Sequence, residues 1–75
     1  MNTWNYRIIQ FGRHSALHEV YYDEHGKPKA YTKDPVTFVC DRGEEAEIVG
    51  GLEMALKDAR DRPVLDASVF EGDAA

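Results

Sequence analysis

The segment over residues 16–39 constrains the fold of this chain more than any other. Aromatic and β-branched residues stand on both sides of Asp23-Glu24-His25-Gly26, and such residues favour strands. The sequence between them suits a type I turn, with Asp at the first position and Gly, which accepts a positive φ, at the last. The sequence therefore predicts an antiparallel hairpin that joins residues 16–22 to residues 29–32.

A first strand is predicted over residues 3–11, where Trp4, Tyr6 and Ile8 fall on one face. Ile9 and Phe11 are apolar on the other face, so either both faces are partly covered or a bulge exchanges them. Residues 12–15 read as a turn. After the hairpin, Asp34-Pro35 interrupts the pattern, and a strand is expected to resume over residues 36–40.

One helix is predicted to begin with Asp41 as its N-cap, with Glu44 reaching back to the capping position. Its end is expected at Arg62-Pro63. Acidic residues crowd its first turn and basic residues its last, which suits the helix dipole. Apolar residues at helical spacing form one stripe, made of Ile48, Val49, Leu52, Ala55, Leu56 and Ala59.

Gly50-Gly51 interrupts this helix, although each glycine costs about 1 kcal/mol relative to alanine. We favour the interpretation that a neighbouring element packs too closely for a Cβ, over a kink or a break into two helices. Beyond Pro63, residues 64–65 and 68–70 are expected to form a short last strand or a strap across the sheet. The sequence predicts one domain over residues 1–70 and a flexible tail over residues 71–75.

The predicted fold class is α+β: a three- to four-stranded antiparallel sheet with one amphipathic helix packed on one face. A chain of 75 residues forms a thin core, so burial against a protein partner or in a homodimer is expected. Its net charge of −5 and its scattered basic residues argue against nucleic-acid binding. The best basic cluster, Lys27, Lys29 and Lys33, suits protection of a sheet edge.

The apolar runs are far shorter than the ~20 residues that span a bilayer, and the first ten residues lack the pattern of a secretory signal. A single cysteine, Cys40, excludes an internal disulfide. We therefore expect a cytoplasmic bacterial protein without membrane contact. No cofactor is expected.

Few residues suggest chemistry. His14, His18 and Cys40 are the only set suited to a metal, but the two histidines straddle a turn and a strand, so no metal site is expected. Cys40 precedes the predicted helix, where the dipole favours a thiolate. An enzyme that uses Cys40 or His18 is therefore kept as an alternative, although a buried structural role suits both residues better.

Four aromatic residues of the predicted strands are the interface candidates: Trp4, Tyr6, Tyr22 and Tyr31. If the helix covers one sheet face, aromatic side chains on the open face are available to a partner, since Trp and Tyr are enriched at interfaces. Cross-strand aromatic pairs that hold a thin sheet together explain the same pattern equally well.

Two resemblances bear on these expectations. The segments WNYR at 4–7, HEVYYDEHGKP at 18–28 and PVLD at 63–66 resemble a family of short uncharacterised bacterial proteins, which implies no catalytic residues. The order of three strands, a helix and a short strand is similar to the HicB antitoxin fold, a reduced ribonuclease-H-like domain. The chain lacks a clear equivalent of the Gly- and Pro-containing HicB loop, and it has no room for an added DNA-binding domain.

The leading expectation is a small non-enzymatic protein-binding or regulatory domain that acts through an aromatic sheet face or an edge strand. One alternative is a HicB-like antitoxin whose acidic surface neutralises a basic RNA-cleaving toxin. The other is the small enzyme based on Cys40 or His18.

Overall fold

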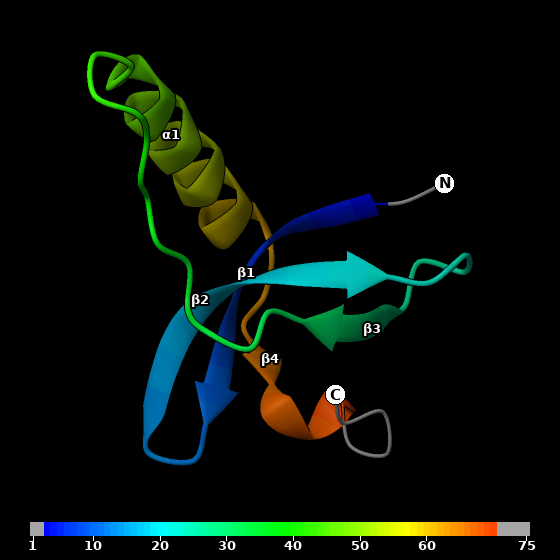
Figure 1. Ribbon diagram of the computed structural model, residues 1–75. Coiled ribbons are helices and arrows are strands. Elements are labelled where there is room, and N and C mark those ends of the chain that lie inside the picture. The colour runs from blue at the N-terminus through cyan, green and yellow to red at the C-terminus, as the bar shows by residue number, and fades with distance from the viewer. Residues whose placement is uncertain (1–2, 71–75) are drawn as a thin grey trace.

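Two long strands joined by a tight turn form the centre of the computed structural model, which describes residues 3–70 (Figure 1). Gly12, with a φ of +51°, lies in the turn between them. The remaining elements are two short strands, one α-helix and one turn of 3-10 helix. All the elements, in chain order, are β1 (Thr3–Phe11), β2 (His14–Tyr22), β3 (Pro28–Tyr31), α1 (Ala46–Asp61), β4 (Leu65–Asp66) and the 3-10 helix η1 (Ala67–Phe70).

The four strands form one curled sheet in the order β3-β2-β1-β4. β1 and β2 pair antiparallel from Thr3 opposite Tyr22 to Phe11 opposite His14 without a bulge. β4 pairs with β1 in parallel, because α1 carries the chain back across the sheet before β4 begins. The predicted α+β fold is therefore confirmed, with the refinement that the sheet is mixed rather than purely antiparallel.

The predicted turn between β2 and β3 is confirmed in detail. The Gly26 N–H donates to the carbonyl oxygen of Asp23 at 3.0 Å, and Gly26 has a φ of +79°. The Asp23 carboxylate accepts two further backbone N–H groups, those of His25 at 2.8 Å and Lys27 at 3.0 Å. These bonds fix the turn that sets the hairpin register.

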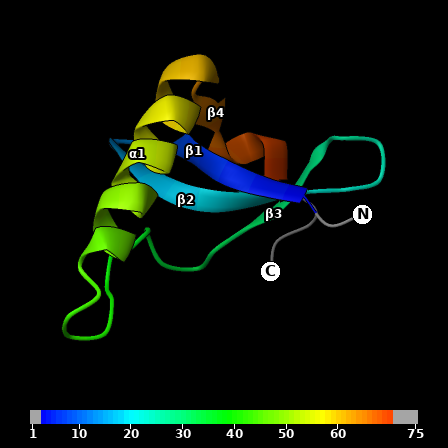
Figure 2. The same cartoon turned by 90° about the horizontal axis from the view of Figure 1, so that it is seen from above.

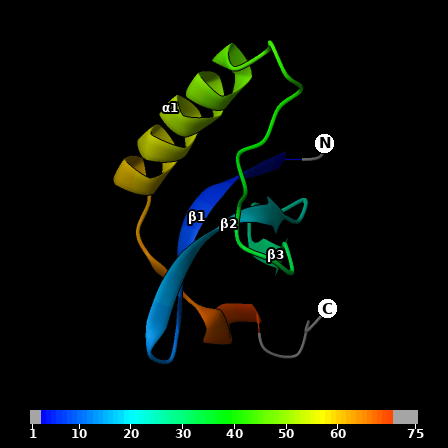
Figure 3. The ribbon, with the colours of Figure 1, turned by 60° about the vertical axis from the view of Figure 1, so that its left-hand side comes forward.

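The strand expected over residues 36–40 is wrong. After β3 the chain stays beside β2 through isolated bonds, from Thr32 N–H to the Glu19 oxygen and from Val36 N–H to the Leu17 oxygen. It then leaves the sheet and runs alongside α1 (Figure 3). Pro35, which has no N–H to donate, lies between the two bonds and prevents a continuous ladder.

The core lies between one face of the sheet and η1. Ile9 and Val20 are completely buried and Phe70 is 4% exposed. Phe11 and Tyr31 are among the partly buried residues that pack around them. The other face of β1 contacts α1, so both faces are covered, and the bulge considered as an alternative in the first strand is not needed.

The helix begins later than predicted. Its N-cap is Glu45, which makes no side-chain capping bond, so the assignment of Asp41 as N-cap is wrong. The Asp41 carbonyl oxygen instead closes a turn by accepting the Glu44 N–H at 3.0 Å, and Gly43 has a φ of +96°. The predicted end is confirmed, since Arg62 before Pro63 is extended, with a φ of −119°.

The packed side of α1 carries small residues. Ala55 is the only fully buried residue of the helix. A Cβ at Gly51 would lie 3.1 Å from the Phe38 ring, and that ring packs against Tyr6 with a centroid distance of 6.1 Å. Close packing is therefore confirmed at Gly51, whereas Gly50 faces open space.

The apolar residues of the predicted helix stripe are not all buried. Ala55 is buried, but Val49, Leu52 and Leu56 remain exposed. The helix contacts the sheet along one side only, and its N-terminal turns extend past the strands (Figure 2). Within residues 3–70, no helix has the length and apolar character needed to cross a membrane. The predicted tail over residues 71–75 lies outside the described residues.

Candidate functional site: a groove beside the N-terminal half of β1

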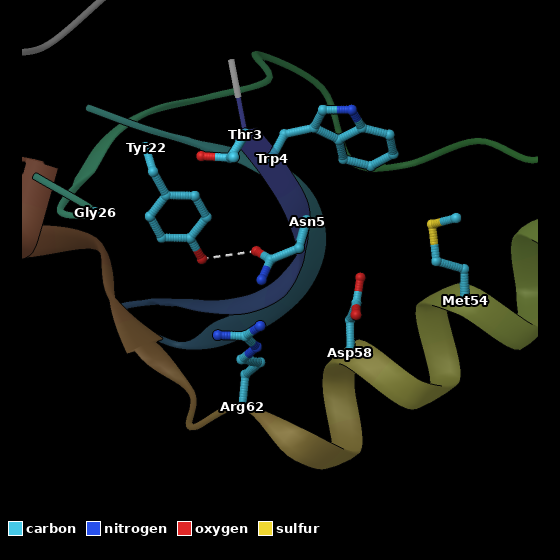
Figure 4. A pocket seen from close by; sticks show the side chains of 8 residues that line it. All are labelled: Thr3, Trp4, Asn5, Tyr22, Gly26, Met54, Asp58 and Arg62. Carbon is cyan, nitrogen blue, oxygen red and sulfur yellow. Dashed lines mark hydrogen bonds between the residues drawn. The ribbon is translucent and has the colours of Figure 1, made fainter. Parts of the chain in front are cut away.

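A groove of about 500 Å³ opens between the N-terminal half of β1, the end of β2 and the C-terminal half of α1. Figure 4 shows the labelled side chains around β1, with Asn5 and Tyr22 on one side of the strand, Trp4 on the other, and Met54 and Asp58 on α1 facing the strand. Its wall combines aromatic, amide, hydroxyl, thioether and charged groups, contributed by Thr3, Trp4, Asn5, Tyr22, Gly26, Met54, Asp58 and Arg62.

A hydrogen-bond network below the groove orients Tyr22. The Tyr22 hydroxyl donates to Asn5 Oδ1 at 2.7 Å and accepts from Arg7 Nη1 at 2.8 Å. The guanidinium of Arg7 also donates to the Pro63 carbonyl oxygen, from Nη2 at 2.7 Å and from Nε at 3.3 Å. The network connects β1, β2 and the segment after α1, so it sets the position of one wall against the others.

Arg7 is unusual because its charge is buried without an acidic partner. Its side chain lies on the core face of β1 and the residue is 6% exposed. Within residues 3–70 no carboxylate forms an ion pair with it, and its bonds go to a hydroxyl and a carbonyl oxygen. A buried cation of this kind depends on every acceptor around it, since an unsatisfied charged group is costly.

Asp58 joins the helix to the edge of β1. Its Oδ2 accepts the backbone N–H of Tyr6 at 3.1 Å, which satisfies a donor that β4 does not reach. Burial, followed by the negative charges of Glu19 and Asp58, raises the pKa of the Tyr6 phenol above its ordinary value. Tyr6 therefore stays neutral at physiological pH and acts as a packing residue.

Trp4 supplies the exposed apolar part of the groove. Its ring meets the Tyr6 ring edge to face, with centroids 5.2 Å apart, yet the residue remains 41% exposed. Met54, on the facing side of α1, is 51% exposed. A rigid ring and a flexible thioether at the mouth of a polar groove suit the binding of an apolar side chain with polar groups around it.

The structure places three of the four predicted interface residues near this groove. Trp4 and Tyr22 line it, and Tyr6 lies beneath Trp4. Tyr31 is elsewhere, because it packs on the core face with its ring 4.8 Å from that of Phe70. The role of all four as interface residues stays a prediction.

The residues considered for metal binding or catalysis lie apart from one another in the fold. His18 is 3% exposed, and its Nδ1 donates to the Thr32 carbonyl oxygen at 2.8 Å. His14 stacks on Phe11 with centroids 5.3 Å apart. Cys40 lies in the loop before α1, and the described part of the chain contains no cluster of three or more side chains able to hold a metal ion.

Several groove residues were not predicted from the sequence. Met54, Asp58 and Arg62 look like ordinary members of an amphipathic helix, and no local pattern marks them. The burial of Arg7 could have been predicted from the sequence, because Arg7 shares a strand face with Ile9 and Phe11. A cation on such an apolar face needs hydrogen-bond acceptors around it.

The segments that carry the family resemblance lie in neighbouring parts of the fold. The first is in β1, the second covers β2 and its turn, and the third leads into β4, which pairs with β1. Comparisons of the chain with known protein families, curated proteins and solved structures found no match. Both resemblances therefore remain predictions.

Proposed function

We propose that this chain is a small, non-enzymatic protein-binding or regulatory domain whose partner places an apolar side chain in the groove beside Trp4. The observation that carries the proposal is the exposed Trp4 ring, held by Tyr6 at the mouth of the groove. Trp, Tyr, Met and Arg are enriched in the centres of protein interfaces. A ring already fixed by its neighbour loses little conformational entropy when a partner binds.

The polar groups of the groove support binding rather than catalysis. Asp58 accepts a backbone N–H, and the Tyr22 hydroxyl is bonded to Asn5 and Arg7. General acid–base catalysis needs a titratable group within reach of a substrate proton, and these groups are already engaged in holding the fold. Buried His18 has a structural partner as well.

An enzyme that uses Cys40 or His18 remains the alternative from the other functional class. The version that uses Cys40 requires a reactive thiolate. The helix N-terminus that would favour a thiolate begins at Ala46, beyond the loop that contains Cys40. Rapid, selective labelling of Cys40 by a thiol reagent at neutral pH would favour this alternative. Labelling no faster than that of an unstructured peptide would remove its cysteine version.

A photo-crosslinking amino acid at position 4, in cells or lysate of the native host, tests the leading proposal. We expect a discrete crosslinked protein, which can then be purified and titrated against the chain. The matched control carries the crosslinker at Val69, an apolar residue of η1 with a similar exposed fraction of 48%. Equal crosslinking from both positions, or none from position 4, would contradict the proposal.

Titration with the purified partner gives a quantitative second test. Trp4 is the only tryptophan, so a shift of its emission reports directly on the groove. Trp4→Ser, which lacks the fluorophore and is titrated by calorimetry instead, is expected to weaken binding by about tenfold or more, as truncation of a central aromatic residue does. An unchanged affinity would place the partner on another surface.

A HicB-like antitoxin is the second candidate. Two observations favour it: the order of three strands, a helix and a short fourth strand, and the net charge of −5, which suits a basic partner. The same crosslinking experiment separates the candidates, because the antitoxin role predicts that the captured protein is a basic, RNA-cleaving enzyme whose activity falls on binding.

We also propose that the domain acts in the bacterial cytoplasm. Small secreted domains commonly depend on several disulfides, and this chain has one cysteine. Its core is instead completed by Phe70 and the other residues of the C-terminal segment.

A further inference from the structure

Three large apolar side chains of α1 are exposed on a side of the helix away from the groove. Val49, Leu52 and Leu56 are 56%, 49% and 56% exposed, whereas Ala55 is only 5% exposed. Spacings of three and four residues place the three exposed residues on one side of the helix, and we call them the α1 stripe. Among the described elements, β1 is the only one with which α1 makes extensive contact. The α1 stripe is thus an apolar surface without a partner inside the described chain.

Charges are separated along the same helix. Glu44, Glu45 and Glu47 lie at its N-terminal end. At its C-terminal end the three cations Lys57, Arg60 and Arg62 outnumber the two carboxylates of Asp58 and Asp61. Lys57 pairs with Asp61 at 2.7 Å, while Arg60 forms no ion pair within residues 3–70. A second copy of α1 laid antiparallel would bring each acidic end against a basic end. A parallel copy would bring like charges together.

The positions of these residues fit a two-fold axis beside Leu52. In an antiparallel pair centred there, Val49 lies opposite Leu56 of the second copy, and Glu45 lies opposite Arg60 of the second copy. Both pairs share the same midpoint along the helix, between Leu52 and Glu53, so one register provides the apolar and the opposite-charge contacts. It also brings the two Glu53 carboxylates near the axis, which opposes pairing. A two-fold interface requires this self-complementarity.

We propose that α1 is a self-association surface, on which two copies of the chain pair antiparallel through the α1 stripe, with Glu45–Arg60 ion pairs at both ends. The helix has 16 residues and is therefore about 24 Å long. Such a helix pair buries less than the about 1,600 Å² of a standard interface, so the dimer is weak and depends on concentration.

This self-association does not rest on the proposed function. Met54 lines the groove, and residues two positions apart on a helix do not share a side, so Met54 and Leu52 face different directions. The groove beside Trp4 stays open when two helices pair through the α1 stripe. The two surfaces can therefore be tested separately.

Sedimentation equilibrium of the purified full chain, from about 1 µM to about 1 mM, gives the first test. We expect the wild-type mass to rise from monomer toward dimer over this range. Leu52→Glu, which places two like charges beside the two-fold axis, is expected to remain monomeric. Its matched control is Met54→Glu, which introduces the same charge on the same helix at a similarly exposed position and should dimerise like the wild type.

A charge exchange tests the antiparallel register. Glu45→Arg and Arg60→Glu each place like charges together at both ends, and each is expected to weaken the dimer by about tenfold. The double variant Glu45→Arg/Arg60→Glu restores opposite charges and should recover most of the wild-type affinity. Recovery is expected only when Glu45 of one copy pairs with Arg60 of another copy of the same chain. Recovery therefore identifies a second copy of the chain as the molecule bound to the α1 stripe. Circular dichroism verifies that each variant is folded.

Several outcomes would overturn the inference. One is a wild-type chain that stays monomeric up to about 1 mM. Another is Leu52→Glu dimerising like the wild type, or Met54→Glu disrupting the dimer as strongly. A double charge variant without recovery would equally exclude the antiparallel pair. None of these results affects crosslinking from position 4, so failure here is distinguishable from failure of the proposed function.

Discussion

The two adjacent glycines of α1 provide a matched pair of substitutions with opposite expectations. Both lie in the interior of the helix, where replacement of Gly by Ala stabilises by about 1 kcal/mol. An added Cβ at Gly50 meets nothing within 4 Å, so Gly50→Ala is expected to gain this full amount. For a domain of this size that corresponds to a rise in Tm of about 4–8 °C.

At Gly51 the same gain is opposed by a steric contact. The added Cβ would lie 3.1 Å and 3.2 Å from two carbon atoms of the Phe38 ring. That ring also packs against Tyr6, so it cannot move aside without loosening the contact between the loop and β1. Overpacking typically costs about 1–3 kcal/mol. We therefore expect Gly51→Ala to be neutral or destabilising, and about 1–3 kcal/mol less stable than Gly50→Ala.

Urea and thermal unfolding followed by far-UV circular dichroism measure both variants under one condition. A double-mutant cycle with Phe38→Leu identifies the cause, because a smaller side chain at position 38 should let Gly51→Ala recover its gain. Gly50→Ala should be unaffected by the same background. If Gly51→Ala stabilises as much as Gly50→Ala in the wild-type background, the close packing of α1 on Phe38 is refuted.

Two further predictions concern the turn and the network below the groove. Tyr22→Phe removes the acceptor of a buried Arg7 N–H and is expected to cost about 1–3 kcal/mol in urea unfolding; Tyr21→Phe, which loses a bond to Glu19 near the surface, is the control and should cost less. Asp23 has its pKa held below the ordinary value of 3.8 by the backbone N–H groups of the turn, the largest effect being that of Lys27. Because the folded-state pKa is depressed, the stabilisation by Asp23 is present at neutral pH and is lost as the pH falls through that pKa. The stability difference between wild type and Asp23→Ala should therefore shrink below pH 4, and a difference independent of pH would contradict this reasoning.

The strands could be predicted because local chemistry specifies them. Asp23 and Gly26 fix the turn, and alternation in the first strand fixes which residues share a face. The orientation of α1 could not be predicted in the same way. An amphipathic pattern identifies the apolar residues, but the packed side of α1 carries two small residues: Gly51, which lies against Phe38 of the preceding loop, and Ala55, which is buried. The distance between two elements is a tertiary property that helical spacing does not contain.

The groove was accessible to sequence reasoning only in part. Trp4 and Tyr22 were identified because aromatic residues on strands are candidates wherever a face is open. Met54 and Asp58 join them only because α1 crosses β1 at one particular place. The parallel pairing of β4 escaped prediction for a related reason, since two residues are too few to show a strand pattern.

The joining of β1 to the segment after α1 has a consequence for synthesis of the protein. The guanidinium of Arg7 holds the Pro63 carbonyl, and Phe70 completes the core around Ile9. The hairpin is assembled from early residues, but its core face stays uncovered until the ribosome has delivered the chain through residue 70. Contacts that span most of a chain form late and slowly. A nascent chain stalled before that point therefore exposes Ile9 and Val20, and is the form of this protein that chaperones are expected to meet.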